Sequence, residues 1–124
     1  MLPLLSHRAY ASLHTRIEDI GKRRDRVFCY FNRGGKEEAI SYSRLLSQSR
    51  RYANALQRRG LKTGDVVLIL LDHTPELLYS FIGVMQAGGI PSFMPPLTPK
   101  QDPAVYWSSH QKLFDRIAPA TLLT

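Results

Sequence analysis

Five side chains in the sequence are of the types that most often act as nucleophiles, proton carriers or metal ligands. They are one cysteine and four histidines: Cys29, His7, His14, His73 and His110. No two histidines stand four residues apart, and one cysteine cannot complete the usual set of zinc ligands. We therefore predict isolated surface or core histidines and no metal site. Cys29 lies inside a strand-like run, which favours a buried structural thiol over a nucleophile.

His73 is the candidate substrate-binding residue. The segment Asp72–Thr74 directly follows the apolar run Val66–Leu71, and open parallel sheets bind their ligands at the carboxyl ends of the strands. A histidine there is also able to exchange protons near neutral pH. The alternative is an ordinary loop in which Thr74 caps the next helix. We predict no catalytic, cofactor-binding or metal-binding residue in the chain.

Basic residues form two groups that could meet an anion. The loop Arg33–Lys36 could gather backbone N–H groups around an anion, or it could be a plain hairpin turn with exposed cations. Arg44, Arg51 and Arg58 stand seven apart and share one side of a helix. Such a stripe is either a phosphate-binding surface or a solvated helix face. We expect these cations to lie on a helix face and at a hairpin tip, and not to converge on one pocket.

Known phosphate-binding and nucleophile motifs are absent from the sequence. It contains no G-x-x-x-x-G-K-[ST], no G-x-G-x-x-G and no G-x-S-x-G. The sequence therefore gives no indication of a glycine-rich phosphate-binding loop or of a turn that carries a catalytic serine. The net charge of +7 favours an anionic partner. No nucleic-acid fold signature or aromatic interleaving accompanies it, so we do not expect nucleic acid to be that partner.

The elements that would position these residues begin with a helix predicted from about Ser6 to Lys22. Its apolar residues recur at spacings of three and four and share one face: Tyr10, Leu13, Ile17 and Ile20. A strand at Val27–Phe31, a turn at Asn32–Lys36 and a return strand from Ala39 then predict a β-hairpin.

A second helix and a buried strand form the centre of the predicted fold. Ser41 is placed to cap this helix, and Gly60 ends it. Its inward face is predicted to hold Leu45, Leu46, Tyr52, Ala53 and Leu56. The run Val66–Leu71 follows. A strand that is apolar on both faces is typical of the middle of a parallel sheet covered by helices.

Two further helices and strands complete the pattern. The helix Thr74–Gln86 has proline in its first turn and is apolar almost all round, so we expect it to be sandwiched. A strand at Ile90–Met94, a helix opened by Asp102 and a strand at Ala120–Leu123 follow. The fourth helix is predicted to face inward with Tyr106, Leu113, Phe114 and Ile117. We also expect four side chains of the sheet and third helix to be nearly inaccessible: Leu68, Leu70, Phe81 and Ile82.

The order of these elements predicts an α/β fold. Strand, helix, strand, helix and strand from Val66 onward make two βαβ units with right-handed crossovers. The chain is thus expected to hold an N-terminal helix, a β-hairpin and a parallel sheet of at least three strands with helices on both faces. The strand Ala120–Leu123 has no covering helix after it. We therefore expect an exposed apolar edge and self-association.

Four segments, in this order, carry a resemblance to a known family. Ser41–Leu46 (SYSRLL) resembles the first core motif of the AMP-forming acyl-activating superfamily, which includes acyl-CoA synthetases, fatty-acyl-AMP ligases and adenylation domains. Gly60–Leu70 (GLKTGDVVLIL) resembles its Gly-x-x-x-Gly-Asp segment and following strand. Thr74–Leu77 (TPEL) is similar to its Ser-Pro-Glu helix start. Met85–Pro96 (MQAGGIPSFMPP) is similar to its second core motif.

The sequence departs from the family pattern at two places. Arg44 stands where the family usually has glutamate, which removes the reciprocal half of a capping box. Gly89–Ser92 replaces a more common Ala-Tyr-Val-Pro pattern. The segment Pro99–Trp107 looks more like lipid-type acyl synthetases than amino-acid activators.

The resemblance implies that residues 1–124 are the truncated N-terminal part of an adenylate-forming domain. The parent enzyme would use ATP and Mg²⁺ to convert a carboxylic acid, of fatty or lipid type, to an acyl-adenylate. It would then pass the acyl group to a thiol of CoA or of a carrier protein. The family's Ser/Thr/Gly-rich ATP loop and its catalytic lysine follow the matched motifs, so we expect the fragment to be inactive. Its main partner would be the remainder of the enzyme.

Two other functions stay open at this point. One is a stand-alone basic module that binds RNA or an anionic surface, and the other is a protein-interaction domain on a synthetase-like scaffold. The longest apolar tract, Val66–Leu71, is far shorter than the roughly 20 residues that span a bilayer. We therefore predict no transmembrane helix. The single cysteine favours a reducing compartment, and we expect the protein to be cytoplasmic.

Overall fold

The computed structural model describes residues 12–23 and 25–124. The first helix, α1, runs over Leu13–Arg23 and buries Ile17. Ser12 and Thr15 at its start exchange hydrogen bonds: the Thr15 N–H donates to Ser12 Oγ at 3.4 Å, and the Ser12 N–H donates to Thr15 Oγ1 at 3.3 Å. The predicted start at Ser6, the apolar Tyr10 and His7 lie outside the described residues.

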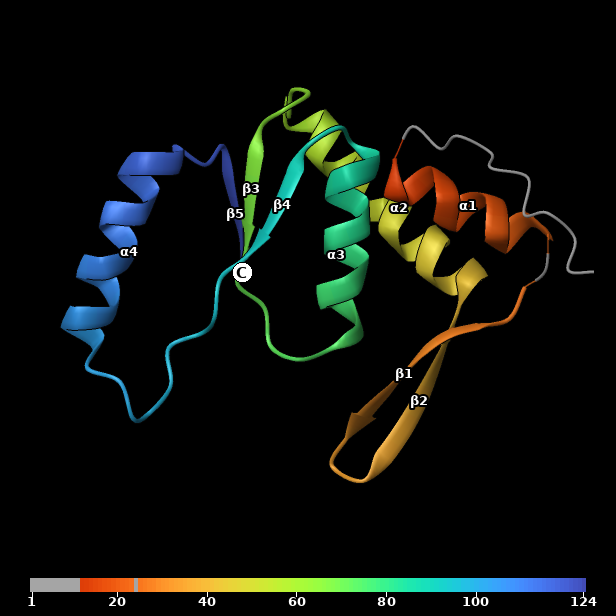
Figure 1. Cartoon of the computed structure of the whole chain (residues 1–124), viewed down its shortest axis with the longest axis horizontal. Coiled ribbons are helices and arrows are strands. Elements are labelled where there is room, and N and C mark those ends of the chain that lie inside the picture. The colour runs from red at the N-terminus through yellow and green to blue at the C-terminus, as the bar shows by residue number, and fades with distance from the viewer. Residues whose placement is uncertain (1–11, 24) are drawn as a thin grey trace, which may run out of the picture.

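The β-hairpin forms as the sequence predicts, with strands β1 (Val27–Arg33) and β2 (Lys36–Ser41). The two-residue turn places Gly34 at φ 57° and Gly35 at φ 80°. Positive φ at both positions is typical of a type I′ turn, whose twist matches that of the paired strands. The return strand begins three residues before the predicted start at Ala39. The hairpin projects from the rest of the chain (Figure 1).

Helix α2 spans Tyr42–Arg58 and begins at an unusual cap. Ser41 Oγ accepts the Arg44 N–H at 3.1 Å, as predicted. Because Arg44 replaces the family's glutamate, the carboxylate at this helix start comes from elsewhere. Asp25 accepts the Ser43 N–H at 3.0 Å and the Ser43 hydroxyl at 2.8 Å. Arg44 instead forms an ion pair with Glu38 of β2 at 2.7 Å.

Replacing Asp25 with alanine should therefore lower the free energy of unfolding by about 1 kcal/mol, the usual loss when a helix cap is removed. Asp115→Ala is the matched control, because Asp115 is an exposed aspartate that accepts a hydrogen bond from Gln111 near the end of a helix. Urea denaturation of both variants would measure the difference. Equal stability of the two variants would contradict the role given to Asp25.

The parallel sheet contains β3 (Val66–Ile69), β4 (Ile90–Phe93) and β5 (Thr121–Leu123) in the order β4-β3-β5. Helix α3 (Pro75–Gln86) connects β3 to β4, and α4 (Pro103–Ile117) connects β4 to β5. Both strand pairs are parallel. This confirms the two predicted βαβ units and the α/β fold class.

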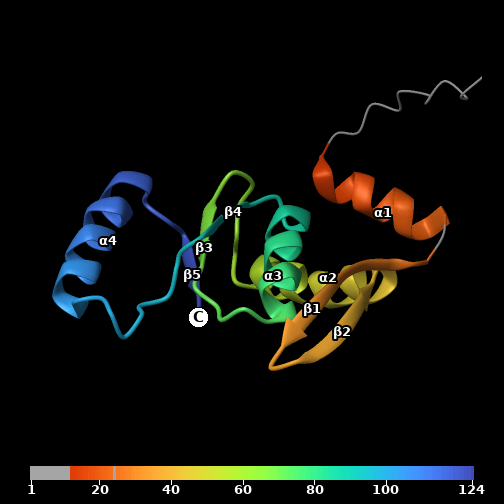
Figure 2. The same ribbon diagram turned by 60° about the horizontal axis from the view of Figure 1, so that its bottom comes forward.

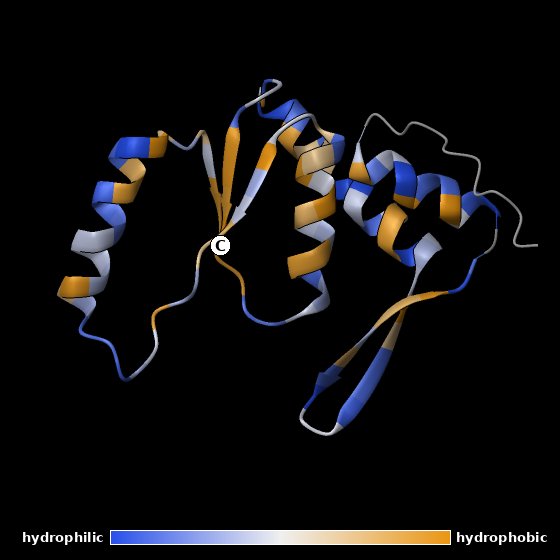
Figure 3. Cartoon of the chain, in the orientation of Figure 1, coloured by the Kyte–Doolittle hydropathy of each residue, from blue (hydrophilic) through white to orange (hydrophobic). Residues whose placement is uncertain are grey.

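Helices cover both faces of this sheet (Figures 1 and 2). On one face, Val67 and Ile69 pack with side chains of α2 and α3. On the other, Leu68 packs with Met94 and with Tyr106 of α4. Asp102 caps α4 as predicted, since it accepts the Ala104 N–H at 2.8 Å. Figure 3 shows that β3 and α3 carry much of the apolar sequence, while the hairpin tip is hydrophilic.

Of the four side chains predicted to be nearly inaccessible, the two in the core are buried and the two near the sheet margin are not. Leu68 and Ile82 are 1% and 4% exposed. Leu70 and Phe81 are only partly buried, contrary to prediction. Leu70 lies beyond the last residue of β3, and Phe81 stacks on the half-exposed Phe93 at the sheet edge. Leu113 of α4 is also exposed, because this helix contacts the sheet through other side chains.

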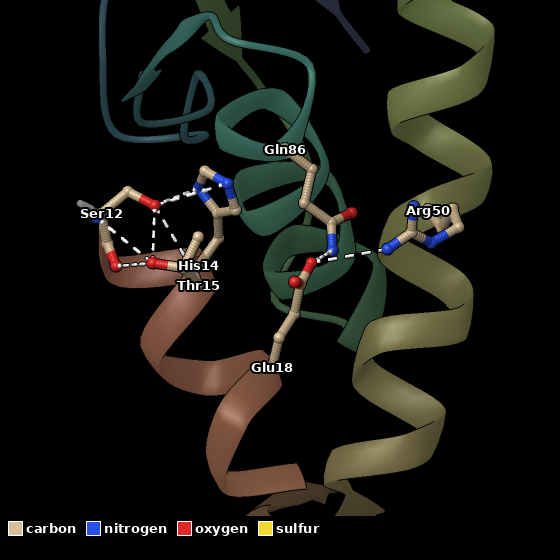
Figure 4. A network of polar contacts seen from close by, with 6 residues as sticks. All are labelled: Ser12, His14, Thr15, Glu18, Arg50 and Gln86. Carbon is tan, nitrogen blue, oxygen red and sulfur yellow. Dashed lines mark hydrogen bonds and ion pairs between the residues drawn. The ribbon is translucent and has the colours of Figure 1, made fainter. Parts of the chain in front are cut away.

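Helices α1, α2 and α3 pack together beside the sheet. Glu18 of α1 lies between the other two helices and accepts from Arg50 of α2 and Gln86 of α3, each at 3.4 Å (Figure 4). The α2–α3 contact is close at Gly83. An added Cβ there would lie 2.5 Å from the carbonyl oxygen of Ser49 and 2.6 Å from Cβ of Tyr52. The absence of a side chain at Gly83 lets the two helix backbones approach.

The two edge strands of the sheet differ. The Ile90 N–H donates to the carbonyl of Asp65, just before β3, at 2.8 Å, and the Met94 N–H donates to the carbonyl of Ile69 in β3 at 2.9 Å. In a parallel ladder the intervening Pro91 then lies with its nitrogen on the outer side, where its missing N–H removes one donor from the exposed edge. Strand β5 contains no proline, and Leu122 on it is 42% exposed. Self-association through this edge remains a prediction.

Candidate functional site

Two of the four segments that resemble the family's motifs, Gly60–Leu70 and Met85–Pro96, meet where β3 and β4 begin. The Gly64 N–H donates to the carbonyl of Gly88 at 2.9 Å, and the Ile90 N–H donates to the carbonyl of Asp65 at 2.8 Å. The Asp65 carboxylate accepts the Lys62 N–H at 2.8 Å and closes the loop before β3. These contacts fix the relative position of two strands. The motif residues at this end of the sheet are therefore structural.

The same junction has little room for side chains. Gly64 and Gly88 both have φ 87°, a conformation that favours glycine. A Cβ at Gly88 would lie 3.1 Å from the hydroxyl of Thr63. A Cβ at Gly89 would lie 2.9 Å from a methyl carbon of Val84 and 3.2 Å from the carbonyl oxygen of Asp65. The Gly-x-x-x-Gly-Asp and Ala-Gly-Gly segments thus pack directly against each other.

His73 lies at the opposite end of the sheet, where the sequence predicted a ligand site. Its side chain is exposed, and its ring lies against that of Phe31 from the hairpin, with centroids 4.9 Å apart. Thr74 occupies the N-cap position of α3, but its side chain makes no capping hydrogen bond to the helix backbone. The Thr74 hydroxyl beside Glu76 instead lowers the pKa of that carboxyl group.

Two hollows flank His73. The first, here called the hairpin hollow, has a volume of about 220 Å³ and is lined by Phe31, Arg33, Lys36, Glu38, His73 and Pro75. The second, the strand-end hollow, has a volume of about 360 Å³ and is mostly apolar. It is lined by residues that follow β3 and by residues at the end of β4 and after it: Leu71, Asp72, His73, Leu77, Phe93, Met94, Pro95 and Pro96.

The hairpin hollow corrects one expectation from the sequence. The cations of the helix face and the hairpin tip were expected not to converge on one pocket. Arg33 and Lys36 instead share a hollow with His73, because the hairpin lies beside the loop between β3 and α3. The hairpin turn itself is confirmed. The hairpin and the loop that carries His73 are far apart in the sequence, so no local sequence pattern predicted that they would share a hollow.

The arginine stripe of α2 does not form one surface of free cations. Arg44 is paired with Glu38. Arg51 donates to the side chain of Gln48 at 3.3 Å. Arg58 is exposed in the last turn of the helix. This arrangement fits the solvated-face interpretation of the stripe.

The remaining reactive side chains are separated from one another. Cys29 is partly buried rather than fully buried, and burial raises the pKa of its thiol, which disfavours the nucleophilic thiolate. His110 binds the carbonyl of Tyr106 at 2.7 Å within α4, and His14 lies 3.0 Å from the Ser12 hydroxyl in α1. Within residues 12–23 and 25–124, no three histidine, cysteine or acidic side chains gather as a metal site.

The largest of the described hollows was not predicted. It lies between α2 and α3, has a volume of about 370 Å³ and is lined by Gln48, Arg51, Tyr52, Ala55, Glu76 and Tyr79. The Tyr79 hydroxyl is buried there without a hydrogen-bond partner among the described residues. Burial also raises the pKa of Tyr79 and of Tyr52.

Across the part of the chain that the structure describes, no helix is sufficiently long and apolar to cross a bilayer.

Known proteins resemble this chain in both sequence and structure. It is 37% identical over 73 residues to 4-coumarate–CoA ligase CCL1 of Humulus lupulus. The aligned residues cover 59% of this chain and 13% of that protein. It is 34% identical over 85 residues to 4-coumarate–CoA ligase 1 of Petroselinum crispum, covering 68% of this chain and 15% of that protein. The chain thus spans a small part of these relatives.

Solved structures agree with this result. The fatty acid AMP ligase of Legionella pneumophila superposes with a TM-score of 0.79 at 26% identity, over 90% of this chain and 19% of that one. The N-terminal subdomain of Klebsiella oxytoca NpsA has the same fold, with a TM-score of 0.73 at 22% identity, over 91% of this chain and 27% of that one. The AMP-binding enzyme family matches residues 18–106. Together with the motif junction, this match shows that the chain belongs to the AMP-binding enzyme family.

Proposed function

We propose that this chain is the N-terminal part of an ATP-dependent acyl-activating enzyme and has no turnover by itself. The enzyme joins a carboxylic acid of fatty or lipid type to AMP and then transfers the acyl group to a thiol of CoA or a carrier protein. The main support is the motif junction at Gly64 and Gly88, which joins the Gly-x-x-x-Gly-Asp segment to the second core motif. The likeness to a fatty acid AMP ligase supports the fatty-type substrate.

In this proposal, the chain supplies structure and one substrate contact. The β4-β3-β5 sheet forms the platform, and His73 at its ligand-facing end is the substrate-binding residue. Among the described residues no carboxylates converge to hold Mg²⁺, and the sequence has no phosphate-cradling loop. We therefore place the ATP, Mg²⁺ and thiol sites in other parts of a longer enzyme. A cytoplasmic location is part of the same proposal.

ATP–pyrophosphate exchange tests this proposal. The purified 124-residue chain should give no exchange above background with lauric, palmitic or 4-coumaric acid, because adenylation requires fixed charges around the α-phosphate. A longer polypeptide from the same reading frame should give exchange with at least one of these acids. The comparison of fatty and aromatic acids tests the substrate class.

Three outcomes would contradict the proposal or its substrate class. Exchange by the 124-residue chain alone would show that the catalytic groups lie within it. A longer polypeptide that bound no nucleotide would remove the family as a guide to function. Exchange by the longer polypeptide with 4-coumaric acid only would replace the fatty-type substrate with an aromatic one.

A further inference from the structure

The hairpin hollow gathers more positive than negative charge. Arg33 and Lys36 come from the two ends of the Gly34–Gly35 turn, and His73 comes from the loop before α3. The one acidic residue in the lining, Glu38, already forms an ion pair with Arg44 at 2.7 Å. Within residues 12–23 and 25–124, neither Arg33 nor Lys36 has an ion-pair partner within 4 Å. The two cations therefore line the hollow without an ion pair of their own. The Glu76 carboxylate of α3 is near enough to Arg33 for the two charges to attract each other.

The shape of the hollow limits what these cations can bind. Pockets that enclose a whole small molecule usually measure about 300–1,000 Å³. The hairpin hollow, at about 220 Å³, is smaller and has room for a charged end group. Its floor is formed in part by the ring pair Phe31 and His73. Arginine and lysine donors converging on a small concave site are suited to phosphate oxygens.

We propose that the hairpin hollow binds the terminal phosphate or diphosphate group of a small soluble ligand. Arg33 and Lys36 supply charge-assisted hydrogen bonds, and His73 closes the site from the sheet side. This site goes beyond the proposed function, because it needs no turnover and lies within this chain. A flat lipid surface would meet the exposed hairpin tip without filling the hollow, so the proposal commits to a soluble phosphate.

The test is a titration of the 124-residue chain with inorganic pyrophosphate at an ionic strength of about 0.1 M. Binding is measured by calorimetry and by the NMR signals of the His73 ring. We expect saturable binding of one pyrophosphate and a shift of the His73 signals. The double variant Arg33→Gln/Lys36→Gln should weaken binding by about tenfold or more, because it removes both cations that would form charge-assisted hydrogen bonds to the phosphate oxygens. The same variant should lose the His73 shift.

The matched control is Arg58→Gln/Arg59→Gln, which removes two positive charges at the far end of α2. It should keep its affinity within about twofold, because surface charges beyond a Debye length of about 10 Å are largely screened. An equal loss in both double variants would show general attraction to a basic protein and would overturn the proposal. No saturable binding by the unmodified chain would also overturn it. So would binding to phosphatidic acid vesicles that excess pyrophosphate does not displace.

These outcomes are separate from those of the exchange assay. Pyrophosphate binding is measured on the 124-residue chain, for which no exchange is expected. A failure of the hairpin site would leave the family assignment and the exchange prediction as they stand. Exchange activity in the chain alone would contradict the proposed function and leave the hairpin site unaffected. Circular dichroism of both double variants would confirm that each is folded.

Discussion

Replacing Gly83 with alanine should lower the free energy of unfolding by about 1–3 kcal/mol, the usual range when extra volume enters a packed core. Alanine would normally stabilise a helix interior by about 1 kcal/mol relative to glycine. At Gly83 the added methyl group would lie 2.5 Å from a backbone oxygen of α2 and 2.6 Å from Cβ of Tyr52. Neither atom can rotate away, so α2 and α3 must move apart.

Gly21→Ala is the matched control for this prediction. Gly21 also lies inside a helix, but the nearest atom to an added Cβ is the end of the Leu46 side chain at 3.0 Å, which can shift. We expect this variant to change stability by less than about 1 kcal/mol, the size of the propensity gain. Urea denaturation of both variants gives the comparison. A Gly83→Ala variant as stable as the unmodified chain would show that the two helices do not approach this closely.

Leu68→Ala should lower the free energy of unfolding by about 2–5 kcal/mol, as core truncations of leucine do. Leu68 is 1% exposed in the central strand, and its side chain fills the space between Met94 and Tyr106 of α4. Removing it leaves a cavity on the face that α4 covers. Because α4 contacts this face through few side chains, we also expect its amide protons to exchange faster in the variant.

Leu70→Ala provides the comparison for this second prediction. Leu70 packs in the same cluster but is only partly buried, so its truncation should cost less than that of Leu68. Denaturant unfolding of both variants would rank them. A loss below about 1 kcal/mol for Leu68→Ala, outside the range of buried leucines, would contradict the packing of α4 on the sheet. So would a larger loss at Leu70.

The order of helices and strands could be predicted because it depends on local patterns. Apolar periodicity predicted the helices, and the doubly apolar run from Val66 predicted the central strand. The turn residues Gly34 and Gly35 predicted the hairpin. Ser41 and Asp102 predicted two helix starts. Each of these signals lies within a few residues of the structure that it specifies.

Contacts between distant segments could not be predicted in the same way. Asp25 caps a helix that begins well after it in the sequence, and no spacing rule relates the two. Ser49 is completely buried because Gly83 lets the helices approach, whereas a serine on a helix usually faces water. The hairpin hollow depends on how the hairpin lies against the loop that carries His73. The burial predictions failed at the sheet margin for a related reason. Leu70 lies beyond the end of β3, and Phe81 stacks on Phe93, which is itself half exposed.

The junction between the Gly64 and Gly88 loops has a consequence for how this protein can change during evolution. The Gly64 loop limits the size of side chains at Gly88 and Gly89, and one of the obstacles at Gly89 is the backbone oxygen of Asp65. A side chain at Gly88 or Gly89 would therefore require the loop before β3 to shift. We expect the two segments to remain compatible only when they change together. A recombination breakpoint between them would join loops that had not been selected together, even if every helix and strand remained intact.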